Sequence, residues 1–267
     1  MPHKTILGKK KEGVNNSLKL HSRKKRMPSW NSNNQRLVLF ADFMGFKNRV
    51  DTYTHPHLLQ EMREFHKKFT NVLKPLKITG YLKEVQFSDS IIITVKGIDF
   101  KSFNLISKAA IGLMHNALKM GLPIKGVIAQ GNFTFDENNE LYIGKALVDA
   151  YLLEEDVKYY GIVVHNTAEK TVKKYTATDN LSNPYSNNKI YISKGKTCHY
   201  HLCWNMINET LSFEDITPKC KDWIETIAEG VSGEPRLYID HTLEILDEDS
   251  KSFNKEENDD DALDKTK

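Results

Sequence analysis

The sequence predicts an α+β fold whose main elements follow in the order strand, helix, two strands, helix, strand. Two observations predict this class. Continuous apolar runs of strand length alternate with segments whose apolar residues recur every three or four positions, as in helices. Glycine and turn-forming residues separate the segments, and the 267 residues are enough for one main domain with appendages.

The first strand and the first helix have clear signals. "RLVLFADF", residues 36–43, is an apolar run of the kind found in a strand buried on both faces. Pro56 marks the start of a helix over residues 56–74. Its apolar residues have helical spacing: Leu58, Leu59, Met62, Phe65, Phe69, Val72 and Leu73.

The next segments complete the pattern. "GYLKEVQFSDSIIITVKG" predicts two strands joined across Ser88 and Asp89. Residues 101–120 return to helical spacing and end before Gly121, a C-cap residue type. "PIKGVIAQGNFTF" is a further strand, closed by the turn signal "DENNE". This order is the split βαβ arrangement, so we expect a ferredoxin-like (βαββαβ) palm.

Two aspartates mark a candidate site. In the split βαβ topology the end of the first strand lies beside the tip of the hairpin, so Asp42 and Asp89 should meet. Two close carboxylates repel each other, and a divalent cation relieves that repulsion while taking the oxygen ligands it prefers. Each aspartate alone is better explained as a turn or hairpin residue, but the pair in this topology leads us to expect a metal site.

The segment after Asp42 suggests a place for phosphate. In "FMGF" a tight turn at Gly45 would present backbone N–H groups at the start of a helix, and Lys47 adds positive charge. Magnesium or manganese held by carboxylates commonly also binds substrate phosphates.

The two ends of the chain differ in charge. Residues 1–30 carry nine Lys or Arg and one acid, whereas residues 247–267 carry nine acids and four lysines. We expect a basic disordered leader (1–34), a catalytic domain (35–206), a C-terminal helical extension (207–246) and an acidic disordered tail (247–267). The leader could contact nucleic acid or an acidic lipid surface, but a role in solubility explains it more simply.

Other features argue against membrane and disulfide classes. No segment approaches the ~18 apolar residues of a membrane span, and the N-terminus lacks the apolar region of a signal peptide, so we expect a cytoplasmic protein. Cys198, Cys203 and Cys220 fit neither a disulfide framework nor a zinc site and are expected to be reduced. His199 and His201 share a strand with two of them, and an ordinary strand explains the pattern better than zinc does.

Several motifs together resemble a known family. "FADFMGF", "FSDSIII", "IKGVIAQG", "YIGKALVDAYLLEE" and "IYISKGKTCHYHL" have the order and approximate spacing of the motifs of class III nucleotide cyclases. The resemblance covers about residues 36–206. The chain also resembles the small pyrimidine cyclases of the bacterial Pycsar antiphage systems.

The resemblance implies roles for individual residues. Asp42 and Asp89 match the aspartates that hold two Mg²⁺ or Mn²⁺ ions on the triphosphate and the ribose 3′-hydroxyl. The phosphate-binding loop is matched by Phe43, Met44, Gly45 and Phe46. Lys194 or Lys196 matches the lysine that neutralises the triphosphate. It further implies a nucleoside triphosphate substrate and a head-to-tail homodimer.

Two departures concern the catalytic machinery. Alignment on the family's glycine puts Val148 at the Asn that orients the ribose and Leu152 at the Arg that stabilises the transition state. Such an arginine contributes ~10³–10⁵ in rate in phosphoryl transfer, so a substitute would be needed. Lys145, Lys125 and Arg49 are candidates.

Two further departures concern the base and the hairpin. Val85 occupies the position where purine cyclases read the base, which leaves UTP or CTP open as substrate, and Ser88 replaces the usual glycine. The leading hypothesis is a metal-dependent nucleotidyl cyclase that makes a 3′,5′-cyclic nucleotide, with an antiphage signal as a role that the Pycsar resemblance suggests. The alternatives are a catalytically degenerate nucleotide-binding module of the same fold and a palm-type polymerase.

Overall fold

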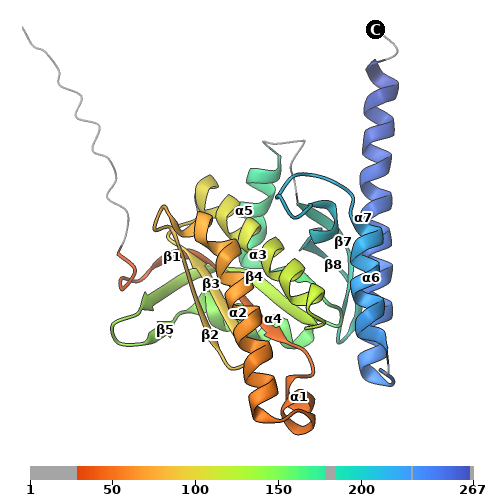
Figure 1. The fold of residues 1–267 in the computed structure, drawn as a ribbon. Helices are drawn as coiled ribbons and strands as arrows, with labels where there is room; N and C mark the ends of the chain where they lie inside the picture. The colour runs from red at the N-terminus through yellow and green to blue at the C-terminus, as the bar shows by residue number, and fades with distance from the viewer. Residues whose placement is uncertain (1–28, 178–183, 230, 265–267) are drawn as a thin grey trace, which may run out of the picture.

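A computed structural model of the chain describes residues 29–177, 184–229 and 231–264; side chains are described as far as residue 253. Figure 1 shows the arrangement of the elements. They are β1 (Asn34–Phe43), α1 (Phe46–Thr52), α2 (His55–Lys77), β2 (Leu82–Phe87), β3 (Ser90–Val95), α3 (Phe100–Lys119), β4 (Ile124–Asp136), β5 (Leu141–Ile143), α4 (Lys145–Asp156), β6 (Ile162–Val164), α5 (Asn166–Thr176), β7 (Tyr185–Ile192), β8 (Gly195–Leu202), the short 3₁₀ helix η1 (Trp204–Met206), α6 (Thr217–Ala228) and α7 (Glu234–Asp264).

The described strands form one sheet with the order β2-β3-β1-β4-β6-β8-β7, and β5 pairs with the end of β4. The first four strands of that order are the ferredoxin-like arrangement predicted from the sequence, which is confirmed. β1 lies between β3 and β4 and is antiparallel to both. β6 adds to β4 in parallel, and the β7–β8 hairpin extends the sheet further. β1 is therefore a central strand, which explains its apolar sequence.

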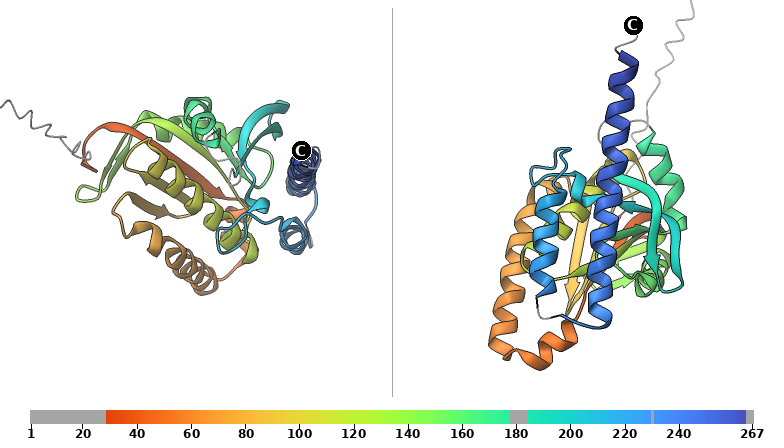
Figure 2. Two further views of the ribbon diagram at one scale, coloured as in Figure 1. Left: turned by 90° about the horizontal axis from the view of Figure 1, so that it is seen from above. Right: turned by 90° about the vertical axis from the view of Figure 1, so that its right-hand side faces the viewer.

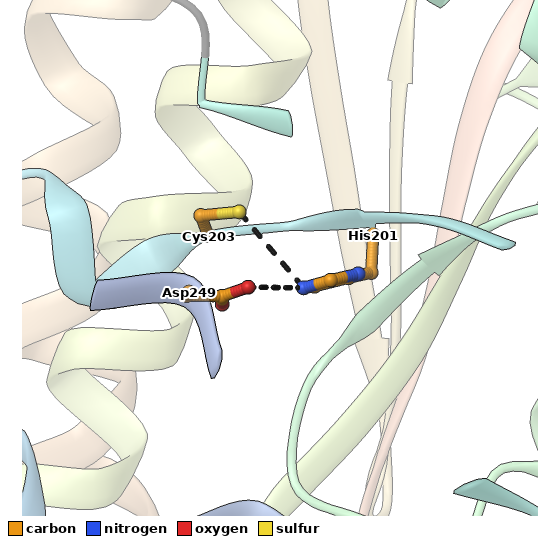
Figure 3. A group of neighbouring side chains, drawn as sticks. All are labelled: His201, Cys203 and Asp249. Atoms are coloured by element: carbon orange, nitrogen blue, oxygen red, sulfur yellow. Dashed lines mark hydrogen bonds and ion pairs between the residues drawn. The ribbon is translucent and has the colours of Figure 1, made fainter. Parts of the chain in front are cut away.

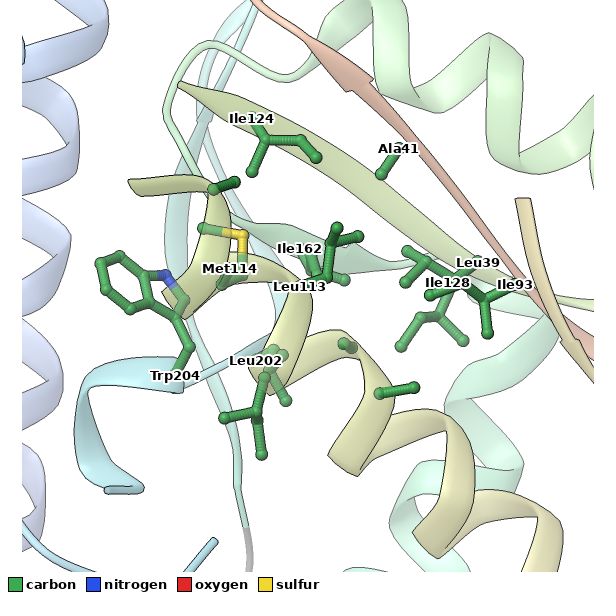
Figure 4. Packing of buried hydrophobic residues seen from close by; sticks show 14 of the residues in the cluster. Leu39, Ala41, Ile93, Leu113, Met114, Ile124, Ile128, Ile162, Leu202 and Trp204 are labelled. Atoms are coloured by element: carbon green, nitrogen blue, oxygen red, sulfur yellow. The ribbon is translucent and has the colours of Figure 1, made fainter. Parts of the chain in front are cut away.

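Both faces of β1 are buried, because helices cover the sheet on two sides. Leu37, Leu39 and Ala41 point into a large core shared with α2 and α3. Figure 4 shows part of that core, with Leu39, Ala41 and Ile93 facing Leu113 of α3. The alternate residue Phe40 packs in a second cluster with Ala150 of α4. Since side chains alternate along a strand, Asp42 lies on the α4 side of the sheet.

Two glycines permit close or unusual backbone geometry near this face. Gly45, between β1 and α1, has a left-handed φ of 72°. Gly144 precedes α4, and a Cβ there would lie 2.2 Å from the carbonyl oxygen of Asn132 on β4. Only glycine lets α4 begin this close to the sheet.

The C-terminal part differs from the expected division. The boundary expected at residue 247 falls inside α7, which is helical as far as Asp264. The start of the acidic segment continues the buried side of the helix, since Asp249 is buried at helical spacing after Thr242 and Ile245. Figure 2 shows α6 and α7 side by side at the edge of the molecule. The extension expected at 207–246 is helical in α6 and in the first part of α7.

The remaining expectations have mixed outcomes. The motif "IYISKGKTCHYHL" forms a hairpin that turns at Ser193 and Lys194. Most of the basic leader, residues 1–28, lies outside the described residues. The last part of the leader packs on the domain, since Trp30 contacts Phe135 of β4.

None of the helices within the described residues has the length and apolar character needed to cross a membrane. The three cysteines are unpaired.

Candidate active site

Asp42 and Asp89 line one pocket. Asp42 is opposite Ser90 in the β1–β3 pairing, and the amide of Phe43 donates to the carbonyl of Asp89 (3.2 Å). The end of β1 is thereby fixed to the tip of the β2–β3 hairpin. The pocket has a volume of about 410 Å³ and is lined by Asp42, Phe43, Met44, Gly45, Phe46, Lys47, Asp89, Lys125, Glu154 and Glu155. The topology thus brings together the two carboxylates singled out in the sequence.

The environment of Asp42 favours a bound cation. Burial raises the pKa of Asp42, and the negative charge of Asp89 raises it further, whereas the Ser90 hydroxyl and the charge of Lys125 lower it. Ser90 Oγ donates to Asp42 Oδ1 at 2.8 Å. Within the described residues Asp42 makes no ion pair shorter than 4 Å. A half-buried carboxylate beside a second one, with oxygen donors around it, fits a hard divalent cation such as Mg²⁺ or Mn²⁺.

Lys125 is directly opposite Asp42 on β4, but its ammonium group is held elsewhere. Lys125 Nζ donates to the carbonyl oxygens of Glu154 (2.7 Å) and Val157 (3.3 Å) at the end of α4. It also lies 3.3 Å from the carboxylate of Glu154, and both side chains are buried. Burial raises the pKa of Glu154 to about 6, against the opposing effect of Lys125. Glu154 is thus a third carboxylate at the pocket, which the sequence reading missed.

The turn after β1 offers fewer free amides than expected. Phe43 and Met44 were matched to a phosphate-binding backbone, but their amides already donate to the carbonyls of Asp89 and Pro123. Gly45 caps α1, whose first amides have no acceptor within the helix. The amides of Gly45, Phe46 and Lys47 therefore remain for an anionic ligand.

The candidate lysines on the β7–β8 hairpin lie away from this pocket in the single chain. Lys196 contacts the carboxylates of Glu244 and Glu248 on α7. Lys194 is in the turn of the same hairpin. Neither lines the pocket of Asp42. Their match to a triphosphate-binding lysine stays a prediction.

The three residues considered as substitutes for the missing arginine lie at different distances from the pocket of Asp42. Arg49 pairs with Glu61 (2.8 Å) and donates to the carbonyl of Gly121, on the other side of the turn. Lys145 pairs with Asp149 (2.6 Å) at the start of α4. Among the three candidates, Lys125 is the one that lines the pocket.

Val148 and Leu152, which stand at the usual Asn and Arg positions, point to solvent. They lie one turn apart on α4 and are 54% and 56% exposed. Val85 is partly buried beside Ile92, opposite it on β3. Ser88 has a left-handed φ of 55°, a region that favours glycine. The serine therefore holds a backbone conformation that glycine adopts at less cost.

Comparison with known proteins gives one consistent result. No family model and no curated protein matches the sequence. Solved structures do match. The catalytic core of a rhodopsin-guanylyl cyclase with converted specificity, in complex with ATPαS, superposes with a TM-score of 0.50 at 12% identity, over 64% of this chain and 96% of that one.

A dimeric guanylyl cyclase domain of the RhoGC fusion protein from the aquatic fungus Blastocladiella emersonii gives the same TM-score and identity, over 64% of this chain and 97% of that one. This protein has the fold of a class III nucleotide cyclase catalytic domain. The nucleotide cyclase fold accounts for about two thirds of the chain and for nearly all of each matched domain. At this identity the match establishes the fold, and the chemistry has to be argued from the residues.

Proposed function

We propose that this protein is a metal-dependent nucleotidyl cyclase, which converts a ribonucleoside triphosphate into a 3′,5′-cyclic nucleotide and pyrophosphate. One observation carries the proposal: Asp42 and Asp89 line the same pocket at the end of β1 in a nucleotide cyclase fold. The fold itself does not require two carboxylates there. A half-buried aspartate without a cationic partner costs stability, so a serine or asparagine would suit a purely structural position better.

The pocket residues suggest a division of labour. Asp42 and Asp89 would hold two Mg²⁺ or Mn²⁺ ions, whose charge would stabilise the oxygens that enter and leave phosphorus. Gly45, Phe46 and Lys47 would bind the triphosphate through their backbone amides. Glu154 holds Lys125 away from Asp42, which leaves that carboxylate available for a cation. In the reaction, the 3′-oxygen forms a bond to the α-phosphorus, pyrophosphate leaves, and the 3′-hydroxyl proton passes to solvent or a nearby base.

A pyrimidine triphosphate is our preferred substrate. Val85 is on the same face of the sheet as Asp42, because it is opposite Ile92, which is in turn opposite Phe40. Its side chain has no hydrogen-bonding group with which to read a purine edge. Val85 thus gives no support for a purine, and the preference for UTP or CTP rests on the resemblance to Pycsar cyclases, which also extends the proposal to a signal made during phage infection.

A homodimer completes the proposal. Val148 and Leu152 form an exposed apolar stripe on α4, and Phe87 at the hairpin beside Asp89 is 83% exposed. Leu152 lies two residues before Glu154, and Phe87 lies two residues before Asp89; both Glu154 and Asp89 line the pocket. A second copy packed over them would remove apolar surface from water and close the open side of the pocket.

The test is to incubate purified full-length protein with Mn²⁺ and each of ATP, GTP, CTP and UTP, and to identify the products by mass. We expect one or more triphosphates to give a cyclic mononucleotide and pyrophosphate. If none of the four is consumed while a known cyclase works in parallel, the proposal is wrong. Linear or cyclic oligonucleotides would instead indicate the palm-type polymerase.

A catalytically degenerate nucleotide-binding module is the second candidate, and Val148 and Leu152 favour it, because they are apolar where a cyclase orients the ribose and stabilises the transition state. It predicts Mn²⁺-dependent binding of a triphosphate without any product. Equilibrium binding measured beside the product assay separates the two functions.

A further inference from the structure

A buried group of three potential metal ligands lies far along the sheet from Asp42. His201 is at the end of β8, Cys203 follows that strand, and Asp249 comes from α7. His201 Nε2 is 2.9 Å from Asp249 Oδ1 and 3.9 Å from Cys203 Sγ. Figure 3 shows the sulfur and the carboxylate converging on the same ring nitrogen. We propose that His201, Cys203 and Asp249 form a site for a transition metal, with Zn²⁺ as the expected ion, that fastens α7 to β8.

The spacing of the donor atoms fits a tetrahedral ion. Zinc binds imidazole nitrogen and carboxylate oxygen at about 2.0–2.2 Å and thiolate sulfur at about 2.3 Å. A tetrahedral arrangement then separates nitrogen from oxygen by about 3.3 Å and nitrogen from sulfur by about 3.6 Å. The observed distances differ from these by only a few tenths of an ångström, so small side-chain rotations would complete the geometry.

The three side chains are buried beside apolar residues. His201, Cys203 and Asp249 are each at most 1% exposed. Val163 lies opposite His201 in the sheet, and Ile245 lies one turn before Asp249 on α7; both belong to an apolar cluster. Within the described residues, His201 is the only ion-pair partner of Asp249. The Cys203 thiol also makes hydrogen bonds with Asp249 and with Ser186, the residue opposite His201 on β7. A divalent ion would replace these contacts with direct bonds to nitrogen, sulfur and oxygen.

Tyr159 supplies an independent indication of a ligand. Its side chain is fully buried, and its hydroxyl has no hydrogen-bond partner among the described residues. Tyr159 belongs to the same cluster as Val163 and Ile245, the residues that flank His201 and Asp249. Buried hydroxyls without a partner are rare. An unpartnered hydroxyl in this cluster is what a bound polar ligand or ion would account for.

A Cys-His-Asp catalytic triad is the main alternative chemistry, and the geometry excludes it. In a triad the nucleophile and the carboxylate contact opposite nitrogens of the imidazole, whereas here both approach Nε2. A metal site needs no substrate access, and the ion would displace the thiol proton when it binds.

Cobalt is the probe for the experiment. The full chain carries the double substitution Asp42→Asn/Asp89→Asn, so that the pocket of Asp42 does not contribute to binding. Bound metal is removed from this variant with a chelator in the presence of a phosphine reductant, and the protein is then titrated with Co²⁺. We expect one equivalent to bind with the visible bands of tetrahedral cobalt and a thiolate-to-cobalt charge-transfer band. Zn²⁺ should displace the cobalt and abolish both.

Cys203→Ala and Cys220→Ala, added to this background, are matched variants because both cysteines are fully buried. Cys203→Ala should remove the charge-transfer band and weaken Co²⁺ binding by more than about 100-fold, since loss of even an outer-shell partner costs about 10–100-fold. Cys220→Ala should change neither. A folded parent protein that binds Co²⁺ without the band, or not at all, would overturn the proposal whether or not Cys203→Ala folds.

Discussion

Asp42 and Lys125 lie directly opposite each other on β1 and β4, yet they do not form an ion pair. The ammonium group of Lys125 is bound to the C-terminal end of α4 through Glu154 and Val157. Asp42 is left with the Ser90 hydroxyl as a hydrogen-bond donor and with Asp89 as a neighbour of like charge. The ammonium group of Lys125 thus has a structural role, and the carboxylates of Asp42 and Asp89 are free to bind a metal ion.

Removing the Ser90 hydroxyl should weaken cation binding in a pH-dependent way. Burial and Asp89 raise the pKa of Asp42, and the Ser90 hydrogen bond opposes this rise, so Ser90→Ala should raise the pKa further. Because a cation binds the deprotonated carboxylate, protons compete more strongly at low pH. We expect Mn²⁺ affinity to fall more at pH 6 than at pH 8, by at most about tenfold, which corresponds to a hydrogen bond of about 1.5 kcal/mol to a charged group.

Isothermal titration calorimetry at the two pH values measures this effect. Ser107→Ala, which removes a buried serine on α3, should leave Mn²⁺ binding unchanged at both. An equal loss of affinity at pH 6 and pH 8 in Ser90→Ala would contradict the proposed competition between metal and proton.

Lys125→Met should destabilise the fold strongly. The substitution leaves the Glu154 carboxylate buried without its cation, and breaking a buried ion pair in this way costs about 3–5 kcal/mol. The double variant Lys125→Met/Glu154→Leu should recover most of that loss, because no unpaired charge remains. Urea unfolding of the two variants and the wild type measures the difference. If Lys125→Met alone is as stable as the wild type, the ammonium group has no structural role.

His115 should make the protein sensitive to acid. It is buried on α3, its Nε2 lies 2.9 Å from the carbonyl of Trp204, and burial lowers its pKa to about 4. The unfolded chain titrates near pH 6.5, so the stability conferred by neutral His115 is complete above that pH and is lost progressively as the pH falls towards 4. At pH 5 the loss should be about 2 kcal/mol.

The comparison for this prediction is His115→Gln against His66→Gln, which alters an exposed histidine. The change in unfolding free energy between pH 7.5 and pH 5 should be smaller in His115→Gln than in the wild type, and unaltered in His66→Gln. Identical pH dependence in all three proteins would show that His115 is not the group responsible.

Ser88→Gly should stabilise the hairpin that carries Asp89. Ser88 has a φ of 55°, which costs a residue with a side chain about 1–2 kcal/mol, partly offset by the greater freedom of glycine in the unfolded chain. We expect a net gain of about 0.5–1 kcal/mol in chemical unfolding. Ser88→Ala keeps the unfavourable φ and should give no gain. A destabilised Ser88→Gly variant would mean that the serine side chain itself holds the turn.

The part of the fold that could be predicted from the sequence depends on local signals. The apolar run before Asp42 and the helical spacing of α2 and α3 fixed the order of the elements, and the topology then placed Asp42 beside Asp89. The β7–β8 turn was not predicted, because the whole segment was matched to one motif and the turn signal in its Ser193–Gly195 segment was not weighed. α7 was ended too early because its acidic composition hides the buried positions of Thr242, Ile245 and Asp249.

Interactions between distant residues could not be predicted. Lys125 was considered as a substitute for an arginine, but its partner Glu154 on α4 is visible only when the helix is packed on the sheet. Asp249 lies 48 residues from His201, so the spacing of the cysteines and histidines gave no sign of a third ligand. The engaged amides of Phe43 and Met44 likewise depend on the neighbouring Asp89 and Pro123.

The central claim is that Asp42 and Asp89 together hold the cations needed for turnover. The direct measurement is the rate of cyclic nucleotide formation with saturating Mn²⁺ and the best of the four triphosphates. It compares the wild type with Asp42→Asn, Asp89→Asn and the control Asp51→Asn, which alters an exposed aspartate on α1. We predict that each of the first two variants, folded as judged by circular dichroism, loses at least about 10²–10³ in rate, the scale of one lost electrostatic contact to the transition state. Asp51→Asn should match the wild type. Cyclic product formed by Asp42→Asn or Asp89→Asn at the wild-type rate would contradict the account.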